Sequence, residues 1–542
     1  MKRRTFLKTA ASAGAALSLQ SCASRLAVNK AGDAAFDVHP FIKNNPGAVF
    51  IHLTDIKTKR DTDGIRSTGE KLGNELIIRK GSAAERAKMK VIVKPNWCNA
   101  RITKGVHIYD KLGSNTDANF VEGWVRGMKN AADGDYFIRE CSTPTQWEPT
   151  GWAAMAKRNN IDLRDLSSMD IWELTEGRDY NFVKVPNGNV FKKIAYMAPV
   201  NQPDTFLVGI AKHKAHGMGI TGAVKNLQGL CANTFHKFCT PHDKIMSYYE
   251  QAYRDCFHAD VAQRIEKLHA KHVEAGIPRW DRPSISSAGW RGGGGIWQEM
   301  WTQRMLDSLS VTHANLSMIE GIYSQDGSGF GSGPHEKLGK YEITSRDYMS
   351  NMVMFGLDPI RVDIIAHWLA GHEPGNFGIF HNAIERGMSD VLDPHDIPVY
   401  LWDEGHATLT QLDSLTRTPL VSYYLGRDYD GQEEPRYHLC NEPFDYSAWK
   451  AGNRSADAAP LFRELGGDND SRRVFDLSLP KRDDVHVAVL NSKGEQVWSL
   501  MADDLEPGVH EVVWDGFASP GMYNCYVKGM GWSAKRKVAV YS

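Results

Sequence analysis

The chain has 542 residues, 42% of them hydrophobic, and a formal net charge of −1. This length is too great for one compact core, so we expect two or more globular domains. The balanced charge excludes the broad positive field of a nucleic-acid-binding protein, and we expect no nucleic-acid partner. The 15 tryptophans and 19 tyrosines can stack on a sugar-like ligand or simply fill cores.

The first residues, MKRRTFLK, have the form of a twin-arginine export signal, with Arg3 and Arg4 ahead of a short apolar stretch. An ordinary secretion signal with a basic front is the alternative. The stretch is too short for a permanent membrane span. Residues 1–22 end in LQSC, which resembles a lipoprotein processing box, so a lipid anchor at Cys22 stays open. We therefore expect a periplasmic or cell-envelope protein that the twin-arginine translocase exports.

Residues 23–46 are small and polar and are typical of a tether. From Gly47 the pattern alternates between strands and helices. The segments AVFIHLTDI, ELIIRK, KVIVKPNWCNA and DYFIREC predict strands, and NFVEGWVRGMKNAA and GWAAMAKRNN predict helices. This alternation predicts an α/β domain over 47–403, with a mostly parallel sheet and flanking helices. Ligands bind at the carboxyl ends of such strands, where Lys94 follows one of them; a solvated strand end is the alternative.

The segment from Asp204 to Cys231 is the centre of the functional prediction. An apolar strand delivers cations and imidazoles to a glycine turn, and a helix follows that carries Lys225 and Asn226. Backbone N–H groups at such a turn favour an anion. A structural tight turn is the alternative; dinucleotide binding lacks the acidic residue that it requires. The predicted anion-binding residues are Lys94, Lys212, Gly217, Gly219, Gly222 and Asn226.

Histidines and carboxylates in and after this segment suggest a divalent metal ion as cofactor. His213 and His216 point to opposite faces of an extended strand, but a turn at Ala215 would bring them together. The alternative is a set of ordinary loop histidines. The predicted metal ligands are His213, His216, His236 and Asp363.

Three further features suggest acid–base chemistry or a binding wall. A predicted strand ends at Glu320 beside a glycine-rich loop, which makes this carboxylate an acid–base candidate. Asp358 before Pro359 predicts a helix start, and Asp363 and His367 share a face of that helix. Trp290, Trp297 and Trp301 flank a run of four glycines and can form a stacking wall. The predicted catalytic residues are His213, His216, Lys225 and Glu320.

Four segments resemble the domain of unknown function 362 family: KPNW, KHKAHGMGITGAVKNLQG, NLSMIEGIYSQDGSGFGSGP and GLDPIRVDIIAHWLAG. They occur in the family's order, and the resemblance covers residues 47–403. The family label implies no settled reaction. Some members carry ferredoxin-type cysteines, whereas the eight cysteines here form no C-x-x-C motif. The resemblance therefore does not extend to electron transfer of that kind.

Residues 404–473 have a mixed composition and predict an extension or linker. Residues 474–542 alternate apolar residues with turns and predict a small antiparallel β-sandwich. This last segment resembles the Ig-like module of flagellar hook-capping proteins, which implies an accessory domain.

Together these features predict an exported enzyme that acts on a small anionic or sugar-derived substrate, with or without a metal ion. Its site is expected at the strand carboxyl ends around the KHKAHGMGITGAVKN loop. The alternatives are a carrier protein that binds a metal or an anion without turnover, and a redox partner protein.

Overall fold

The structure is a computed structural model of the whole chain. It describes residues 35–97, 109, 112–141, 146–165, 169, 171–216, 218–232, 235, 255–278, 294–312, 314–326, 336–338, 341–343, 346–420, 422–423, 437–438, 442–452, 461–466, 473–479, 482–506, 508–515, 519, 521–529 and 532–540.

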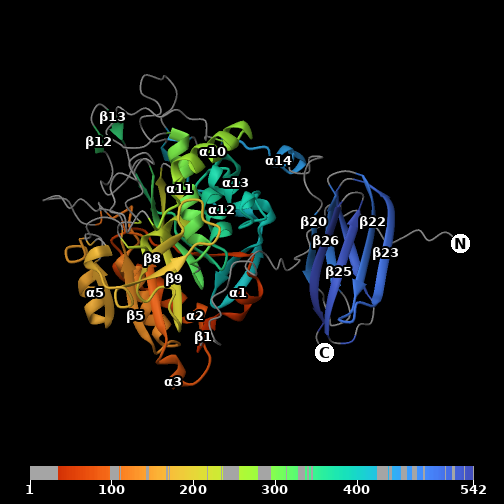
Figure 1. Cartoon of the computed structure of the whole chain (residues 1–542). Coiled ribbons are helices and arrows are strands. Elements are labelled where there is room, and N and C mark those ends of the chain that lie inside the picture. The colour runs from red at the N-terminus through yellow and green to blue at the C-terminus, as the bar shows by residue number, and fades with distance from the viewer. Residues whose placement is uncertain are drawn as a thin grey trace. The chain divides into compact units, whose positions relative to one another are not determined.

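The described residues form two compact units, one within Ser21–Phe444 and the other within Asp445–Ser542. The first contains the large sheet and most of the helices (Figure 1). No helix in the described part of the chain combines the length and the apolar character that a membrane crossing requires.

One large mixed sheet organises the first unit. Its strands run in the order β17 (His406–Thr410), β16 (Val399–Asp403), β2 (Val49–Leu53), β15 (Met352–Gly356), β11 (Leu316–Gln325), β9 (Thr205–His216), β4 (Lys90–Pro95), β5 (Asp135–Glu140) and β6 (Ile161–Asp165). Two short strands, β10 (Gly219–Thr221) and β14 (Asp347–Tyr348), pair with β9 and β11.

The sheet is largely parallel, as predicted. Strands β6, β5, β4, β9 and β11 pair in parallel, and β15 enters antiparallel between β11 and β2. The carboxyl ends of β4, β5, β9 and β11 therefore lie along one edge of the sheet. Strand β9 is buried over nearly its whole length, as expected for a central parallel strand covered on both faces.

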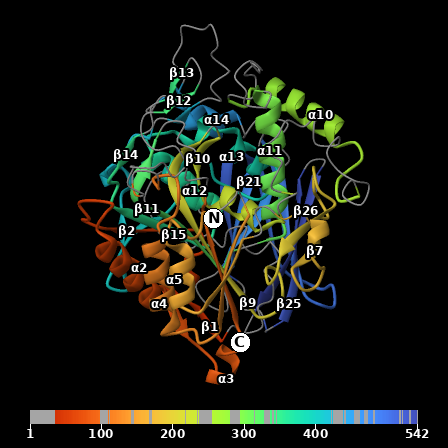
Figure 2. The ribbon, with the colours of Figure 1, turned by 90° about the vertical axis from the view of Figure 1, so that its left-hand side faces the viewer.

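Helices flank this sheet. They are α1 (Pro40–Asn44), α2 (Thr62–Leu76), α3 (Ala83–Arg86), α4 (Ala118–Lys129), α5 (Trp152–Arg158), α6 (Ala223–Leu227), α10 (Val261–Glu274), α11 (Gly294–Leu309), α12 (Pro359–Leu369) and α13 (Gly378–Glu385). Figure 2 shows α2, α4 and α5 grouped together, and α2 and α4 pack closely. Two other helices contact strands of the large sheet: α6 contacts β9, and α12 contacts β15.

Glycines allow the close approach of α2 and α4. A Cβ atom added to Gly123 would lie 1.9 Å from the backbone oxygen of Arg66, and one added to Gly69 would lie 2.1 Å from that of Phe120. Any larger residue would push the two helix backbones apart. Helix α2 was not predicted, because its last residues were assigned to the strand ELIIRK. That segment contributes only β3 (Ile77–Arg79), which pairs with β1 (Phe36–Val38) outside the large sheet.

Small antiparallel sheets complete the structure. In the first unit they are β7 (Tyr180–Lys184) with β8 (Lys193–Met197), β12 (Glu336–Leu338) with β13 (Tyr341–Ile343), and β18 (Ser422–Tyr423) with β19 (Tyr437–His438). The second unit holds α14 (Tyr446–Gly452), a sheet of β20 (Leu461–Gly466), β21 (Arg473–Leu479) and β24 (Gly508–Trp514), and a sheet of β23 (Gln496–Leu505), β22 (Asp483–Leu490), β25 (Gly521–Gly529) and β26 (Trp532–Val540). These last two sheets share one hydrophobic cluster.

Candidate functional site

A buried ion pair joins the carboxyl ends of β4 and β5. The ammonium of Lys94 donates to Glu140 Oε2 at 2.7 Å and to Asn226 Oδ1 at 3.0 Å, and the side chains of Lys94 and Glu140 are each 1% exposed. Burial raises the pKa of Glu140, and the charge of Lys94 opposes that rise. A Cβ atom on Gly229 would lie 2.4 Å from Glu140 Oε1, so this position leaves room for the pair. The structure thus brings the predicted Lys94 and Asn226 together around a carboxylate of the protein itself.

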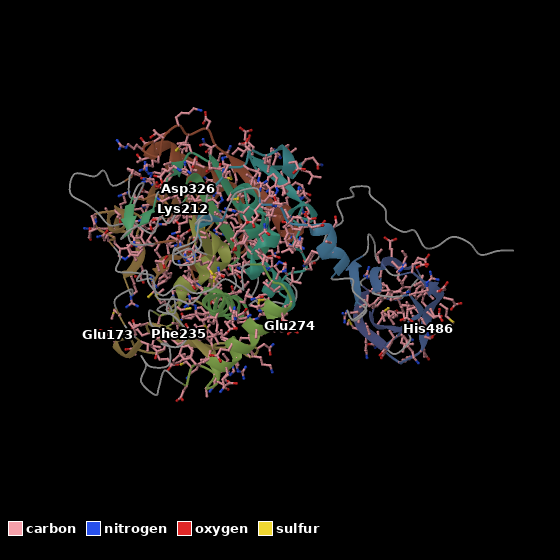
Figure 3. The ribbon with its side chains drawn as sticks, turned by 90° about the horizontal axis from the view of Figure 1, so that it is seen from above. Glu173, Lys212, Phe235, Glu274, Asp326 and His486 are labelled. Atoms are coloured by element: carbon pink, nitrogen blue, oxygen red, sulfur yellow. The ribbon has the colours of Figure 1, made fainter. Side chains whose placement is uncertain are left out.

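A second buried ion pair joins β9 and β11. Lys212 Nζ donates to Glu320 Oε2 at 2.7 Å, and neither side chain is exposed. The ammonium also lies 3.3 Å from the centroid of the Tyr323 ring, whose hydroxyl donates to Asp117. Burial raises the pKa of Glu320 and lowers the pKa of Lys212, and each partner's charge opposes the shift of the other. Figure 3 shows Lys212 within the large unit, surrounded by other side chains.

Two details of the predicted strand ends are wrong. Strand β11 continues five residues beyond Glu320, to Gln325, because its last residues pair with β14 and with β9. The chain also makes no turn at Ala215, because β9 continues to His216 and Ala215 pairs with Ile220 of β10.

His213 and His216 consequently have different neighbours. His213 donates from Nε2 to the carbonyl oxygen of Ala366 at 3.1 Å and accepts at Nδ1 from the Ser324 hydroxyl at 2.9 Å. Burial lowers the pKa of His213 to about 4, so its ring is neutral at pH 7. His216 accepts at Nδ1 from the backbone N–H of Met218 at 3.1 Å.

Two side chains of α12 form hydrogen bonds with the glycine turn after β9 and with the start of α6. Both carboxylate oxygens of Asp363 accept backbone N–H groups at the start of α6, from Ala223 and, at 3.1 Å, from Val224. His367 accepts the N–H of Ile220 at 3.0 Å and donates to the Asp363 carbonyl oxygen at 2.7 Å. Burial raises the pKa of Asp363 to about 7, although these backbone N–H groups oppose the rise. Helix α12 itself begins as predicted, with Asp358 as N-cap and Pro359 in the first turn.

The close approach of α12 explains two of the glycines. A Cβ atom on Gly222 would lie 2.0 Å from Asp363 Oδ1, and one on Gly219, where φ is +105°, would lie 2.5 Å from His367 Nε2. The structure therefore places a carboxylate of the protein at the helix start where an external anion was predicted. Gly217 lies outside the described residues, so its predicted role stays a prediction.

Cationic and aromatic side chains gather around His216; we call this group the Trp301 cluster. The Trp301 ring lies edge-on to His216, with ring centroids 5.0 Å apart. Lys225 Nζ and Arg304 Cζ lie 5.2 and 5.4 Å from the Trp301 centroid. Gln228 Oε1 accepts from Trp301 Nε1 at 3.0 Å and from Arg304 Nη2 at 2.7 Å. The members of the cluster are Lys214, His216, Lys225, Gln228, Trp301 and Arg304.

The Trp301 cluster contains three cationic side chains, those of Lys214, Lys225 and Arg304. Burial and the charges of Lys225 and Lys214 lower the pKa of His216 well below its usual value, so the ring is neutral at pH 7. Lys214 also donates to the Ser114 carbonyl oxygen at 2.6 Å. Trp301 is 3% exposed and packs inside the cluster, so this ring does not form the predicted open stacking wall. Trp290 and the side chain of Trp297 lie outside the described part of the structure.

Sequence reasoning named Lys225 and Trp301 but missed Gln228 and Arg304. Each missed residue lies three positions after a named one. In a helix this spacing places two side chains on one face, and it is the signal that could have found them.

Among the residues that the structure describes, no three His, Cys, Asp or Glu side chains are placed to hold a metal ion. His213 and His216 have separate partners, and the carboxylate of Asp363 binds the start of α6. His236 lies outside the described residues. A metal ion bound by these four residues therefore stays a prediction.

Comparison with protein families identifies the central part of the chain. Residues 91–367, about half of the chain, match the family described as Domain of unknown function (DUF362). The chain belongs to the DUF362 family. The matched segment contains both buried ion pairs, the glycine turn and the Trp301 cluster of this DUF362 protein, and it is narrower than the range 47–403 predicted from the sequence.

Other comparisons add little. No curated protein matches this DUF362 chain. One matching solved structure is "The Crystal Structure of Parabacteroides merdae Beta-Glucuronidase (GUS) with Glycerol in Active-Site", with 13% sequence identity and a TM-score of 0.12. The match covers 15% of this chain and 12% of that chain, and it carries no argument about fold or function.

Proposed function

We propose that this DUF362 protein is an exported enzyme that acts on a small anionic substrate at the Trp301 cluster, with His216 as the proton acceptor. One observation carries the proposal: the neutral imidazole of His216 is buried beside Trp301 and interacts electrostatically with the charges of Lys214 and Lys225. A neutral imidazole accepts a proton at its unprotonated nitrogen, which in His216 is Nδ1. This nitrogen accepts the Met218 N–H, so the proton transfer would require that hydrogen bond to open.

Electrostatics support an anionic substrate. Charges interact more strongly in a buried environment than in water, so an anion beside Lys214 and Lys225 would be bound favourably. The same anion would offset the two charges that lower the pKa of His216. The imidazole would therefore become a stronger base when the substrate is bound.

The two ion pairs would have a supporting role in this proposal. Lys94 and Lys212 are buried against Glu140 and Glu320, so their charges are largely balanced inside the protein. Asn226, one residue after Lys225, accepts from Lys94 and thereby ties α6 to the end of β4. We infer that these lysines hold the site in place rather than contact the substrate.

Binding of an anion is tested first. We expect isothermal titration calorimetry with phosphate, sulfate and small carboxylates to find at least one ligand whose affinity falls about tenfold in Lys225→Met, since a lost charge interaction of about 1.4 kcal/mol corresponds to that factor. The exposed Lys157 on α5 provides a matched control, and Lys157→Met should bind as the wild type does. Equal affinities in Lys225→Met and the wild type would contradict the proposed site.

Turnover separates an enzyme from a carrier protein that binds an anion without chemistry. Incubation with pooled metabolites, followed by mass spectrometry, should show a substrate that disappears with the wild type and persists with His216→Asn. If an anion binds more weakly to Lys225→Met than to the wild type, but no substrate is converted, the carrier protein is favoured.

We also propose export by the twin-arginine route, supported by Arg3 and Arg4 ahead of the apolar stretch. The variant Arg3→Lys/Arg4→Lys should keep the protein in the cytoplasm, as measured by cell fractionation and immunoblotting. Unchanged export in this variant would contradict the route. We further propose that the two antiparallel sheets of the second unit form an accessory β-sandwich, since they share a core of their own.

A further inference from the structure

One buried imidazole connects three helices next to the Trp301 cluster. His272 of α10 bonds through Nδ1 to Glu299 Oε2 of α11 at 2.6 Å, and through Nε2 to Glu385 Oε2 of α13 at 2.7 Å. Its side chain is 2% exposed. Two carboxylates accept from the two nitrogens of one ring, which requires a proton on each nitrogen.

The surroundings of His272 favour its charged form. Burial alone would lower its pKa, but the hydrogen bonds and charges of Glu299 and Glu385 raise it to about 9. The neighbouring charged and titratable groups come from each helix. Lys271 of α10 pairs with Glu385, and Asp307 of α11 pairs with Arg386 after α13. Burial lowers the pKa of His381 of α13, and the charge of His272 lowers it further. Glu299 also accepts from Gln303 and Asn382.

Helix α11 carries both this contact and part of the cluster. Glu299 lies two residues before Trp301 and five before Arg304, so one stiff helix presents the carboxylate to α10 and α13 and presents Trp301 and Arg304 to Gln228, which follows α6. A change in the position of α11 would therefore move Trp301 and Arg304 together.

We propose that His272 is a positioning residue for the Trp301 cluster, and that its doubly bonded, protonated ring ties α11 to α10 and α13 and thereby holds Trp301 against His216. The effect of His272 on substrate binding rests on the proposed function. The position of Trp301 can be tested without it.

The direction of the pH effect follows from the charge. The folded protein holds the proton of His272 more tightly than the unfolded chain does, so the stabilisation is complete below about pH 6.5 and is lost as the pH rises through about 9. A neutral ring has only one N–H, so it can donate to Glu299 or to Glu385 but not to both. One of the two hydrogen bonds by which His272 connects the helices is then lost.

The position of Trp301 can be followed without any ligand. In protein labelled with 5-fluorotryptophan, the fluorine NMR resonance of Trp301 can be assigned by its absence in Trp301→Phe. We expect this resonance to shift between pH 7.5 and 10 in the wild type, with a midpoint near 9. In His272→Gln it should already be displaced at pH 7.5 and should not titrate. In His272→Arg, which keeps a positive charge, the pH 7.5 position should be retained up to pH 10.

His395 provides a control, because it also lies between two carboxylates, Asp393 and Asp413, and none of these three residues belongs to α10, α11 or α13. His395→Gln should leave the Trp301 resonance unchanged. A wild-type resonance that is constant from pH 7.5 to 10 would overturn the inference, even if His272→Gln failed to fold.

Phosphate binding separates this inference from the proposed function. We expect His272→Gln to weaken phosphate binding at pH 7.5 about tenfold, within the usual range for coupling between sites. A wild type that binds no phosphate or other anion, but shows the expected Trp301 titration, would contradict only the proposed function. Unchanged affinity in His272→Gln, together with a loss in Lys225→Met, would contradict only the role of His272.

Discussion

The variant Lys212→Met is expected to lower the free energy of unfolding by about 3–5 kcal/mol, because it leaves the buried carboxylate of Glu320 without its partner. Unfolding in urea at pH 8, followed by circular dichroism, measures this loss. The loss should be smaller at pH 5. Burial already raises the pKa of Glu320, and without Lys212 its protonated form would be the stable one in the folded state, so stability rises as the pH falls.

The double variant Lys212→Met/Glu320→Gln tests whether the loss comes from the unpaired charge. It should be more stable at pH 8 than Lys212→Met alone, because it buries no uncompensated ion. Of the two backbone N–H groups that donate to Glu320, that of Ile322 to Oε1 and that of Asp117 to Oε2, one keeps a partner in the single amide oxygen of the new glutamine. If the stability lost in the double variant equals the sum of the losses in Lys212→Met and Glu320→Gln, the two residues are not coupled.

The variant Gly222→Ala is expected to destabilise the protein by about 3 kcal/mol, at the upper end of the usual cost of overpacking a core. The added methyl group would overlap Asp363 Oδ1, and that carboxylate is fixed by α6 itself. Because α6 carries Lys225 and Asn226, anion binding should be lost as well. Thermal unfolding and calorimetric titration measure the two effects.

Gly209→Ala is the matched control in the same segment, since its added methyl group would have no heavy atom nearer than 3.9 Å. It should unfold at nearly the wild-type temperature. The variant Asp363→Ala removes the carboxylate that bonds to α6. In this variant, the further substitution Gly222→Ala should lower the free energy of unfolding much less than it does in the wild type. An equal cost in both backgrounds would show that Asp363 is not the obstacle.

The elements of the large sheet were predictable wherever local pattern determines structure. The run KVIVKP predicts a short buried strand, and β4 covers Lys90–Pro95. Asp358–Pro359 predicts a helix start, and α12 begins there with the Asp358 side chain as cap. Helix α2 was missed because its last residues were assigned to a strand and because glycines interrupt its polar sequence. Two of these glycines, Gly69 and Gly73, are explained only by the backbone of α4.

The partners of the site residues were not predictable, because they depend on the order of strands in the sheet. The sequence shows Lys94 and Lys212 as cations near the predicted site, but their carboxylates follow 46 and 108 residues later. The same limit applies to the glycine turn, whose N–H groups bond to Asp363 from 140 residues away. A local sequence pattern can therefore predict that cations lie close together, but not which carboxylates of the protein pair with them.

The place of β2 in the sheet constrains how the chain can fold during synthesis. This strand begins at Val49, yet its neighbours β15 and β16 span Met352–Gly356 and Val399–Asp403. A nascent chain must therefore keep an early apolar strand unpaired until about 300 further residues have been added. During this interval β2 presents two unprotected edges, which favours aggregation and gives chaperones a defined segment to shield.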